Sequence, residues 1–317
     1  MGLNRWLGCI ENPTTGREAV ETRSARPATH VSDVLVIGAG PAGLQAAIAA
    51  AGAGHRVTVL ERDAAAGGQV RLAGSVPNRA ELGDMVRNQV NECRRLRVVV
   101  EYGVDADVAH VRSRSPDHVI VATGAVAQRP WWVAEGVANV CDVRDVLTGA
   151  AAPSGRVVLI DEVGFHHATS VAELLADRGC AVEVVTNAMV VGQDLGITLD
   201  MEQWWLRATA KSIAQATDLV PMNFDGTTLT LLHHPTGRDE LRSPDWVVLA
   251  VPAAPADALF HGLRAAADPG SFTVERVGDC VAPRRAHAAV VEGQRAGAHV
   301  PVRAGRAEVA RGRVART

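Results

Sequence analysis

The chain has 317 residues, of which 47% are hydrophobic and 21% are charged, and its formal net charge is −3 at pH 7. Such a composition is typical of a globular protein, and so small a charge gives no general attraction to nucleic acid. No stretch reaches the roughly 18 apolar residues that span a bilayer, and the N-terminus lacks the pattern of a signal peptide. We therefore expect a cytoplasmic protein with no nucleic-acid or membrane partner, while its oligomeric state stays open.

The sequence offers no residue set for metal binding or for side-chain catalysis. The cysteines are dispersed, at Cys9, Cys93, Cys141, Cys180 and Cys280, with no C-x-x-C pair. This spacing excludes a redox dithiol and a zinc knuckle. No Ser-His-Asp triad or acid–base catalyst stands out, so the catalytic residues stay unknown and any chemistry would belong to a bound cofactor.

In chain order, residues 1–30 are polar and rich in turn formers, which predicts an irregular N-terminal arm. From residue 31, short runs of Val, Leu and Ile alternate with alanine-rich helical segments, a pattern that predicts a parallel sheet covered by helices. A second strand-helix-strand unit runs over residues 156–186. A helical stretch and a hairpin around Asp225 and Gly226 follow it.

This order of elements places one Rossmann-like unit inside another. We expect an α/β fold with two dinucleotide-binding domains, the second inserted into the first. The first domain would comprise residues 31–150 and 245–300, and the inserted domain residues 151–244. Residues 301–317 carry five arginines and predict a flexible basic tail.

The stretch "VLVIGAGPAGLQAA" places Gly38, Gly40 and Gly43 in G-x-G-x-x-G spacing between a strand and a helix. Gly38 would permit the tight turn, Gly40 the approach of a pyrophosphate, and Gly43 the packing of helix on strand. Glu61 ends the next strand, where its carboxylate could accept hydrogen bonds from the adenosine ribose hydroxyls. This combination predicts a dinucleotide or another ADP-containing ligand.

Three further segments carry candidate ligand contacts. Gly68 and Gln69 follow Gly67 in "AAAGGQVRLA", which could also be a plain loop, and Thr123 and Gly124 follow a buried strand. Asp279, after Gly278, could reach the ligand or simply cap the last helix. The expected cofactor-binding residues are Gly38, Ala39, Gly40, Pro41, Ala42, Gly43, Glu61, Arg62, Gly68, Gln69, Thr123, Gly124, Gly278 and Asp279.

Together these motifs resemble those of flavoproteins with two dinucleotide-binding domains, in which the first site holds FAD. Within that superfamily, "CIENPTTGRE", "VTVLERDAAAGGQVRLA" and "VGDCVAPRRAHAAVVEGQRAG" resemble the C-terminal part of the 2,4-dienoyl-CoA reductase and trimethylamine dehydrogenase family. The resemblance covers residues of about 7–300. It implies an oxidoreductase that uses FAD, with ADP as an alternative occupant of the same site.

The resemblance also implies parts that this sequence does not contain. Members of the family begin with a flavin barrel, related to old yellow enzyme, that carries FMN and the substrate pocket. A four-iron, four-sulfur cluster follows, and Cys9, before Asn12 and Pro13, matches its last ligand. The other three ligands are absent, and one thiolate cannot hold such a cluster. We expect no complete iron–sulfur site, with Cys9 either an unpaired relic or a ligand completed by another subunit.

The second strand-turn-helix, "RVVLIDEVGFHHATS", has a degenerate glycine turn. Asp161, Glu162 and Val163 stand where glycines are expected, and only Gly164 is left. Two carboxylates would repel a pyrophosphate, and a branched side chain would block its approach. In the family, some members bind NADPH here and others do not. These residues argue against NAD(P)H, although Asp161, Gly164 and His166 would line such a site if it existed.

We therefore expect an FAD-binding oxidoreductase module that transfers electrons between its flavin and a partner centre. That centre would be an FMN barrel subunit, an iron–sulfur cluster or an electron carrier. One alternative is a non-catalytic ADP- or FAD-binding subunit, or the remnant of a split enzyme. Another is a stand-alone NAD(P)H-dependent flavin reductase. The substrate stays open, because the resemblance assigns the substrate pocket to the barrel.

Overall fold

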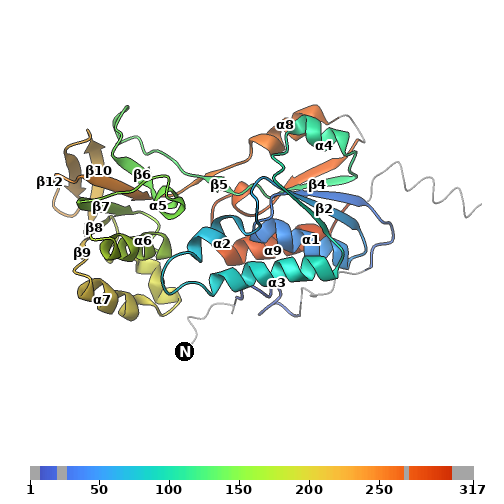
Figure 1. Ribbon diagram of the computed structural model, residues 1–317, viewed down its shortest axis with the longest axis horizontal. Coiled ribbons are helices and arrows are strands. Elements are labelled where there is room, and N and C mark those ends of the chain that lie inside the picture. Colours follow the sequence, from blue (N-terminus) through green and yellow to red (C-terminus); the bar gives the residue numbers. More distant parts are fainter. Residues whose placement is uncertain (1–7, 20–26, 268–270, 302–317) are drawn as a thin grey trace, which may run out of the picture. The chain divides into compact units, whose positions relative to one another are not determined.

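The computed structural model describes residues 8–19, 27–267 and 271–301 (Figure 1). The basic tail expected at 301–317 therefore lies almost wholly outside the described residues. The chain divides into two compact units. The first unit comprises Met1–Arg71, Glu81–Val126 and Ala254–Thr317, and the second unit comprises Leu72–Ala80 and Ala127–Ala253.

The first unit is built on a five-stranded sheet in the order β15-β4-β1-β2-β3, and its strands all pair in parallel. The strands are β1 (Asp33–Ile37), β2 (Arg56–Glu61), β3 (Val99–Tyr102), β4 (His118–Val121) and β15 (Thr273–Arg276). Because all five run in one direction, the loops that follow them meet at a single edge of the sheet. That carboxyl edge is where open α/β sheets bind ligands.

Helices cover both faces of this sheet (Figure 1). They are α1 (Pro41–Gly52), α3 (Leu82–Arg95), α4 (Val108–Ser113), α8 (Ala258–Ala266) and α9 (Ala286–Ala298). The short helix α2 (Gly68–Ala73) has no buried residue, and its last two residues are counted with the second unit. Alternate side chains of β1 serve the two faces, as strand geometry requires. Val34 and Val36 pack with the alanines of α1, whereas Leu35 and Ile37 pack with α4 and α8.

Helices α1 and α9 pack at unusually short range. A Cβ added to Gly293 would lie 2.2 Å from the carbonyl oxygen of Ala42, and one added to Gly297 would lie 2.1 Å from that of Ala46. Glycines four residues apart share one helix face, so this face of α9 meets α1 backbone to backbone. Gln45 reinforces the pair by donating from Nε2 to Oε1 of Gln294 at 2.8 Å.

The second unit contains a parallel sheet in the order β6-β13-β7-β8-β9. Its strands are β6 (Val140–Asp142), β7 (Arg156–Asp161), β8 (Ala181–Thr186), β9 (Ala214–Ala216) and β13 (Trp246–Ala250). The helices are α5 (Val143–Thr148), α6 (His166–Asp177) and α7 (Met201–Ala210), with the short turn η1 (Gln193–Ile197). Leu159 of β7 packs with α6 and α7.

On the other face of β7, Ile160 packs with an antiparallel sheet of β10 (Leu219–Phe224), β11 (Leu229–His233) and β12 (Arg238–Arg242). A two-stranded ribbon of β5 (Ala125–Val126) and β14 (Ala254–Pro255) lies where the chain leaves and re-enters the first unit. The insertion of one Rossmann-like unit into another is therefore the observed architecture, and the expected fold class is confirmed.

The domain boundaries differ from the expected ones. The expected first domain includes residues 72–80, 127–150 and 245–253, which belong to the second unit. Among them, β6 and β13 pair within the second sheet, where β13 lies directly beside β7. The run "WVVLA" has the pattern of any buried parallel strand. Its neighbour is fixed by a pairing across some ninety residues of sequence, which local patterning does not record.

Across the described ranges, no helix has both the length and the hydropathy needed to cross a bilayer.

Candidate functional site

The loop between β1 and α1 and the first turn of α1 contain three glycines in different surroundings. Gly38 has φ +102°, and an added Cβ would lie 2.5 Å from the carbonyl oxygen of Ala122. At Gly43 an added Cβ would lie 1.9 Å from the carbonyl oxygen of Gly38. Nothing lies within 4 Å of a Cβ at Gly40. The fold itself thus requires glycine at the first and third positions, whereas at Gly40 the open space is on the side that a ligand could fill.

The first turn of α1 begins directly after Gly40. Gly40 is its N-cap and provides no side-chain cap, Pro41 follows at the first position, and the first turn has no acidic residue. The positive end of the helix dipole and the N–H groups of Ala42 and Gly43 therefore favour an anion here. A pyrophosphate fits both the charge and the open space above Gly40.

Glu61 stands beside this loop at the end of β2. It is 7% exposed, and its two oxygens accept hydrogen bonds from the backbone N–H of Ala39 at 2.6 Å and of Asp63 at 2.9 Å. A carboxylate has about four lone-pair positions, so acceptor capacity is left for ribose hydroxyls. The Arg62 side chain is 70% exposed and lies 3.9 Å from Asp63.

Gly68 and Gln69, which could have belonged to a plain loop, begin α2 against the glycine turn. The N–H of Gly67 donates to the carbonyl of Ala39 at 2.8 Å, and a Cβ at Gly68 would lie 3.6 Å from the Cα of Gly40. Gly67 has φ +118° and Gly68 φ +49°, both in the region that favours glycine. The structure therefore brings this segment against Ala39 and Gly40 of the loop.

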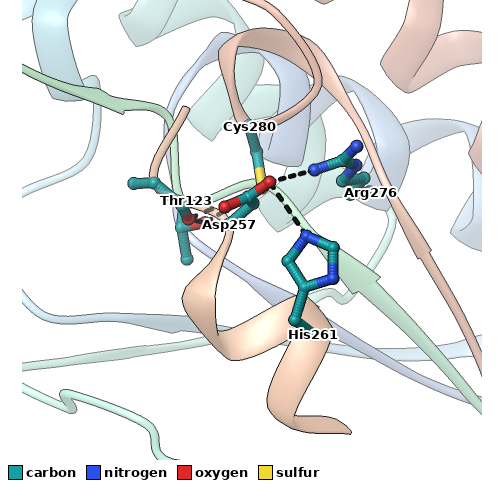
Figure 2. A network of polar contacts seen from close by, with 6 residues as sticks. Thr123, Asp257, His261, Arg276 and Cys280 are labelled. Atoms are coloured by element: carbon teal, nitrogen blue, oxygen red, sulfur yellow. Dashed lines mark hydrogen bonds and ion pairs between the residues drawn. The ribbon is translucent and has the colours of Figure 1, made fainter. Parts of the chain in front are cut away.

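Thr123 and Gly124 follow β4 at the same sheet edge. The Thr123 hydroxyl donates to the carbonyl of Ala256 at 2.6 Å and lies 3.3 Å from the Cys280 sulfur (Figure 2). Burial raises the pKa of the Cys280 thiol. A Cβ at Gly124 would meet nothing within 4 Å. Thr123 thus links the end of β4 by a hydrogen bond to Ala256, where the chain re-enters the first unit.

Asp257 extends this network toward β15, as Figure 2 shows. Its carboxylate accepts from Nε2 of His261 at 3.1 Å and from the guanidinium of Arg276. Desolvation works to raise the pKa of Asp257, but the bonds and charges of His261 and Arg276 outweigh it and hold this pKa below its usual value. Sequence reasoning missed this network, because it joins segments that only the sheet order brings together.

Gly278 and Asp279 form the turn η2 (Gly278–Cys280) after β15. A Cβ at Gly278 would lie 2.7 Å from that of Ala42, so this turn directly contacts the start of α1. The Gly278 N–H donates to Glu292 of α9 at 2.8 Å, a contact that sequence reasoning also missed. Asp279 accepts from the N–H of Arg284 at 3.0 Å. The N-cap of α9 is Arg285, so Asp279 does not occupy the N-cap position.

The corresponding turn of the second unit is arranged differently. Asp161 is 0% exposed. One of its oxygens accepts from the N–H of Val163 at 3.3 Å and of Gly164 at 2.8 Å, and the other accepts from the N–H of Gly192 at 3.0 Å. Burial raises the pKa of Asp161, while these three bonds oppose the shift. Burial and the neighbouring Asp161 also raise the pKa of Glu162.

His166 is the first residue of α6, and its side chain is 15% exposed. Its Nε2 lies 3.1 Å from Asp200, and its ring packs on Phe165 with centroids 4.4 Å apart. Desolvation, with a contribution from the charge of Arg79, lowers the pKa of His166 to about 4, and Asp200 opposes this shift. His166 is therefore neutral at pH 7 and belongs to the packing of this turn.

The low pKa of His166 gives a pH-dependence of stability. Between pH 6.5 and about 4 the unfolded chain accepts a proton that the folded chain refuses, so the free energy of unfolding should fall as pH falls through this window. We expect His166→Gln to reduce this loss by on the order of 1–3 kcal/mol.

The measurement is urea unfolding at several pH values between 4.5 and 7, followed by tryptophan fluorescence. Five of the six tryptophans, at 131, 132, 204, 205 and 246, lie in the second unit, so this signal reports its unfolding. The exposed His167 provides the matched control, His167→Gln. Equal pH profiles for wild type and His166→Gln would contradict the assignment.

Cys9 is half-buried, and its sulfur accepts from the N–H of Asn12 at 3.4 Å. Over the described part of the chain, no group of three or more His, Cys, Asp or Glu side chains is arranged to hold a metal ion. Cys9 therefore contributes to no site that these residues form by themselves.

Comparison with known proteins agrees with this geometry. The pattern of the pyridine nucleotide-disulphide oxidoreductase family matches residues 32–185. The N,N-dimethylglycine/sarcosine dehydrogenase of Chromohalobacter salexigens is 31% identical over 90% of this chain and 47% of its own length. The multifunctional alkene reductase/demethylase of Caballeronia cordobensis is 31% identical over 90% of this chain and 46% of its own length. The solved 6-hydroxypseudooxynicotine amine oxidase of Pseudomonas geniculata N1 superposes with a TM-score of 0.88 at 28% identity, over 93% of this chain and 46% of that one.

The fold, the glycine turn and these matches define a flavoprotein oxidoreductase with two dinucleotide-binding domains. More particularly, the chain belongs with the C-terminal nucleotide-binding parts of the 2,4-dienoyl-CoA reductase and trimethylamine dehydrogenase family. The chain spans about half the length of the curated relatives it matches, and the match lies in their C-terminal parts.

Proposed function

We propose that the first unit binds FAD and that the protein passes electrons between this flavin and a partner redox centre. The pyrophosphate would lie on the N–H groups of the Gly38–Gly43 loop, the adenosine ribose beside Glu61, and the ribityl chain beside Gly278 and Asp279. When bound, the flavin supplies the redox chemistry, and the protein supplies its position and electrostatic surroundings.

The open space above Gly40 carries this proposal. Gly38 and Gly43 are needed to close the turn, but nothing in the fold explains glycine at position 40. A ligand that approaches the backbone there does explain it, and the uncapped N-terminus of α1 favours a ligand that is negatively charged. Glu61, Thr123 and Gly278 surround the same edge, at the ends of β2, β4 and β15.

We propose a partner redox centre because the relatives are about twice as long as this chain. The chain matches only 47% of the dimethylglycine/sarcosine dehydrogenase, so that enzyme contains further segments that this chain does not match. An FMN barrel, an iron–sulfur cluster or an electron carrier would fill this role here.

The first test is the absorbance spectrum of the purified protein, with chromatography of the released cofactor to distinguish FAD, FMN and ADP. We expect bound FAD, or uptake of FAD on reconstitution with a stoichiometry of one per chain. Colourless protein that fails to take up FAD would contradict the proposal. Bound ADP without FAD would instead favour a non-catalytic nucleotide-binding subunit.

Anaerobic mixing with NADH and with NADPH in a stopped-flow instrument separates electron transfer to a partner from a stand-alone reductase. We expect neither nucleotide to bleach the bound flavin rapidly, because the second unit has Asp161 in its turn. Rapid bleaching by either would favour the NAD(P)H-dependent flavin reductase. Dithionite serves as the positive control for a flavin that can be reduced.

A further inference from the structure

The turn between β7 and α6 contains a carboxylate where a Rossmann-like unit ordinarily receives a phosphate. In the first unit the first turn of α1 has no side-chain cap, and a Cβ added at Gly40 would meet nothing within 4 Å. In the second unit α6 also has no side-chain cap, but in the turn before its N-cap, Phe165, the N–H groups of Val163 and Gly164 donate to Asp161. A third N–H, from Gly192 after β8, completes the set.

The backbone is shaped to aim these N–H groups at the carboxylate. Gly164 has φ +62° and Gly192 has φ +65°, in the left-handed region that favours glycine. Successive N–H groups in such conformations form an anion-binding concavity. An added Cβ at Gly192 would lie 2.8 Å from Leu195, so this position admits no larger residue without a shift. The two glycines thus give the backbone the conformation in which its N–H groups bind the Asp161 carboxylate.

We propose that Asp161 is an internal anion that occupies the phosphate-binding turn of the second unit and closes it to nicotinamide nucleotides. This inference concerns the second unit alone and stands independently of flavin binding by the first.

The turn would be closed to a phosphate because the Asp161 carboxylate already occupies its N–H donors, and not because the carboxylate repels a phosphate at a distance. Asp161 is 0% exposed, and its two oxygens engage three N–H donors from two segments of the chain. A backbone N–H satisfied by a buried carboxylate is not available to an incoming phosphate. Displacement of the carboxylate would leave a buried charge without partners, which is more costly than loss of an exposed ion pair.

Chemical rescue tests this arrangement in the full-length protein. Asp161→Gly removes a CH2–COO− group, for which acetate is the matching free anion. Thermal unfolding of the second unit is followed by the fluorescence of its five tryptophans. It is recorded in sodium acetate and in sodium chloride of equal ionic strength. Glu162→Gln is the matched control, since it removes the neighbouring carboxylate and leaves Asp161 in place.

We expect Asp161→Gly to lower the Tm of this transition by about 5 °C in chloride and acetate to restore most of the loss. Wild type and Glu162→Gln should have the same Tm in both salts. Asp161→Asn should also lower the Tm but gain nothing from acetate, because its amide fills the space and turns an N–H donor toward N–H groups.

The inference is overturned if Asp161→Gly unfolds at the wild-type Tm, or if chloride restores it as well as acetate does. If Asp161→Gly yields no soluble protein, Asp161→Asn decides, and a wild-type Tm for that variant overturns the inference. Binding of NADPH to the wild-type second unit, detected as energy transfer from its tryptophans, would overturn it as well. Flavin absorbance in the same samples reports on the first unit, so failure of flavin binding is recognised separately.

Discussion

Gly40→Ala is expected to weaken FAD binding by about 100-fold while the fold stays intact. Gly40 has φ −74°, which any residue adopts, and its Cβ would meet nothing within 4 Å. The added methyl group would instead stand where the pyrophosphate approaches the N-terminus of α1. Loss of one or two charge-assisted hydrogen bonds, at roughly 1.5–3 kcal/mol each, is sufficient for this effect.

The measurement is titration of apoprotein with FAD, followed by flavin fluorescence, together with the Tm of the apoprotein. Alanine is a poorer N-cap than glycine, so the folding cost should stay near 1 kcal/mol. Gly83→Ala in α3 is the matched control, because its Cβ also meets nothing within 4 Å and lies in a different helix. Wild-type FAD affinity for Gly40→Ala would refute the placement of the pyrophosphate.

Gly293→Ala is expected to destabilise the first unit by at least 2 kcal/mol and to release its flavin. The new Cβ would lie 2.2 Å from the carbonyl oxygen of Ala42, and neither backbone can yield without moving a helix. Separation of α9 from α1 would also withdraw Gly278, whose backbone packs on Ala42. The cofactor site would then open at the side of its ribityl contacts.

The expected change in the free energy of unfolding for Gly293→Ala has the opposite sign to the usual effect of Gly→Ala in a helix. In a helix interior, Gly→Ala ordinarily stabilises by about 0.5–1 kcal/mol, and Gly83→Ala should do so or remain neutral. Circular dichroism in urea gives the free energy of unfolding, and retained absorbance after gel filtration gives the bound flavin. A stabilised Gly293→Ala protein with full flavin content would show that the helices separate more easily than the structure implies.

The glycine turn, Glu61 and the alternation of strands and helices could be predicted because each is local. A turn that needs positive φ at Gly38 demands glycine in the sequence itself, and a parallel sheet needs helices between its strands. The sequence could not predict in this way that β6 and β13 belong to the sheet of the second unit. Buried strands of Val and Leu look alike wherever they pair, so the boundary depends on contacts far apart in sequence.

The same limit explains the contacts around the site that were missed. Glu292 reaches Gly278 from the second turn of α9, and Asp257 meets Arg276 only because β15 is added beside β4. Asp161 was predicted as a repelling charge, since the turn alone shows a carboxylate in place of glycine. Its role as an acceptor depends on Gly192, which arrives from beyond the next strand.

The discontinuity of the first unit has a consequence for its synthesis. β15, Gly278 and α9 all follow the inserted unit in the chain, so a ribosome makes them last. All strands of the second unit's parallel sheet have been synthesised by residue 253. The first unit still lacks its edge strand β15 and the helix α9, which packs on α1, until about residue 298 has left the ribosome. The nascent chain should therefore fold its inner unit first, and the site proposed for the cofactor should be complete only after translation has passed α9.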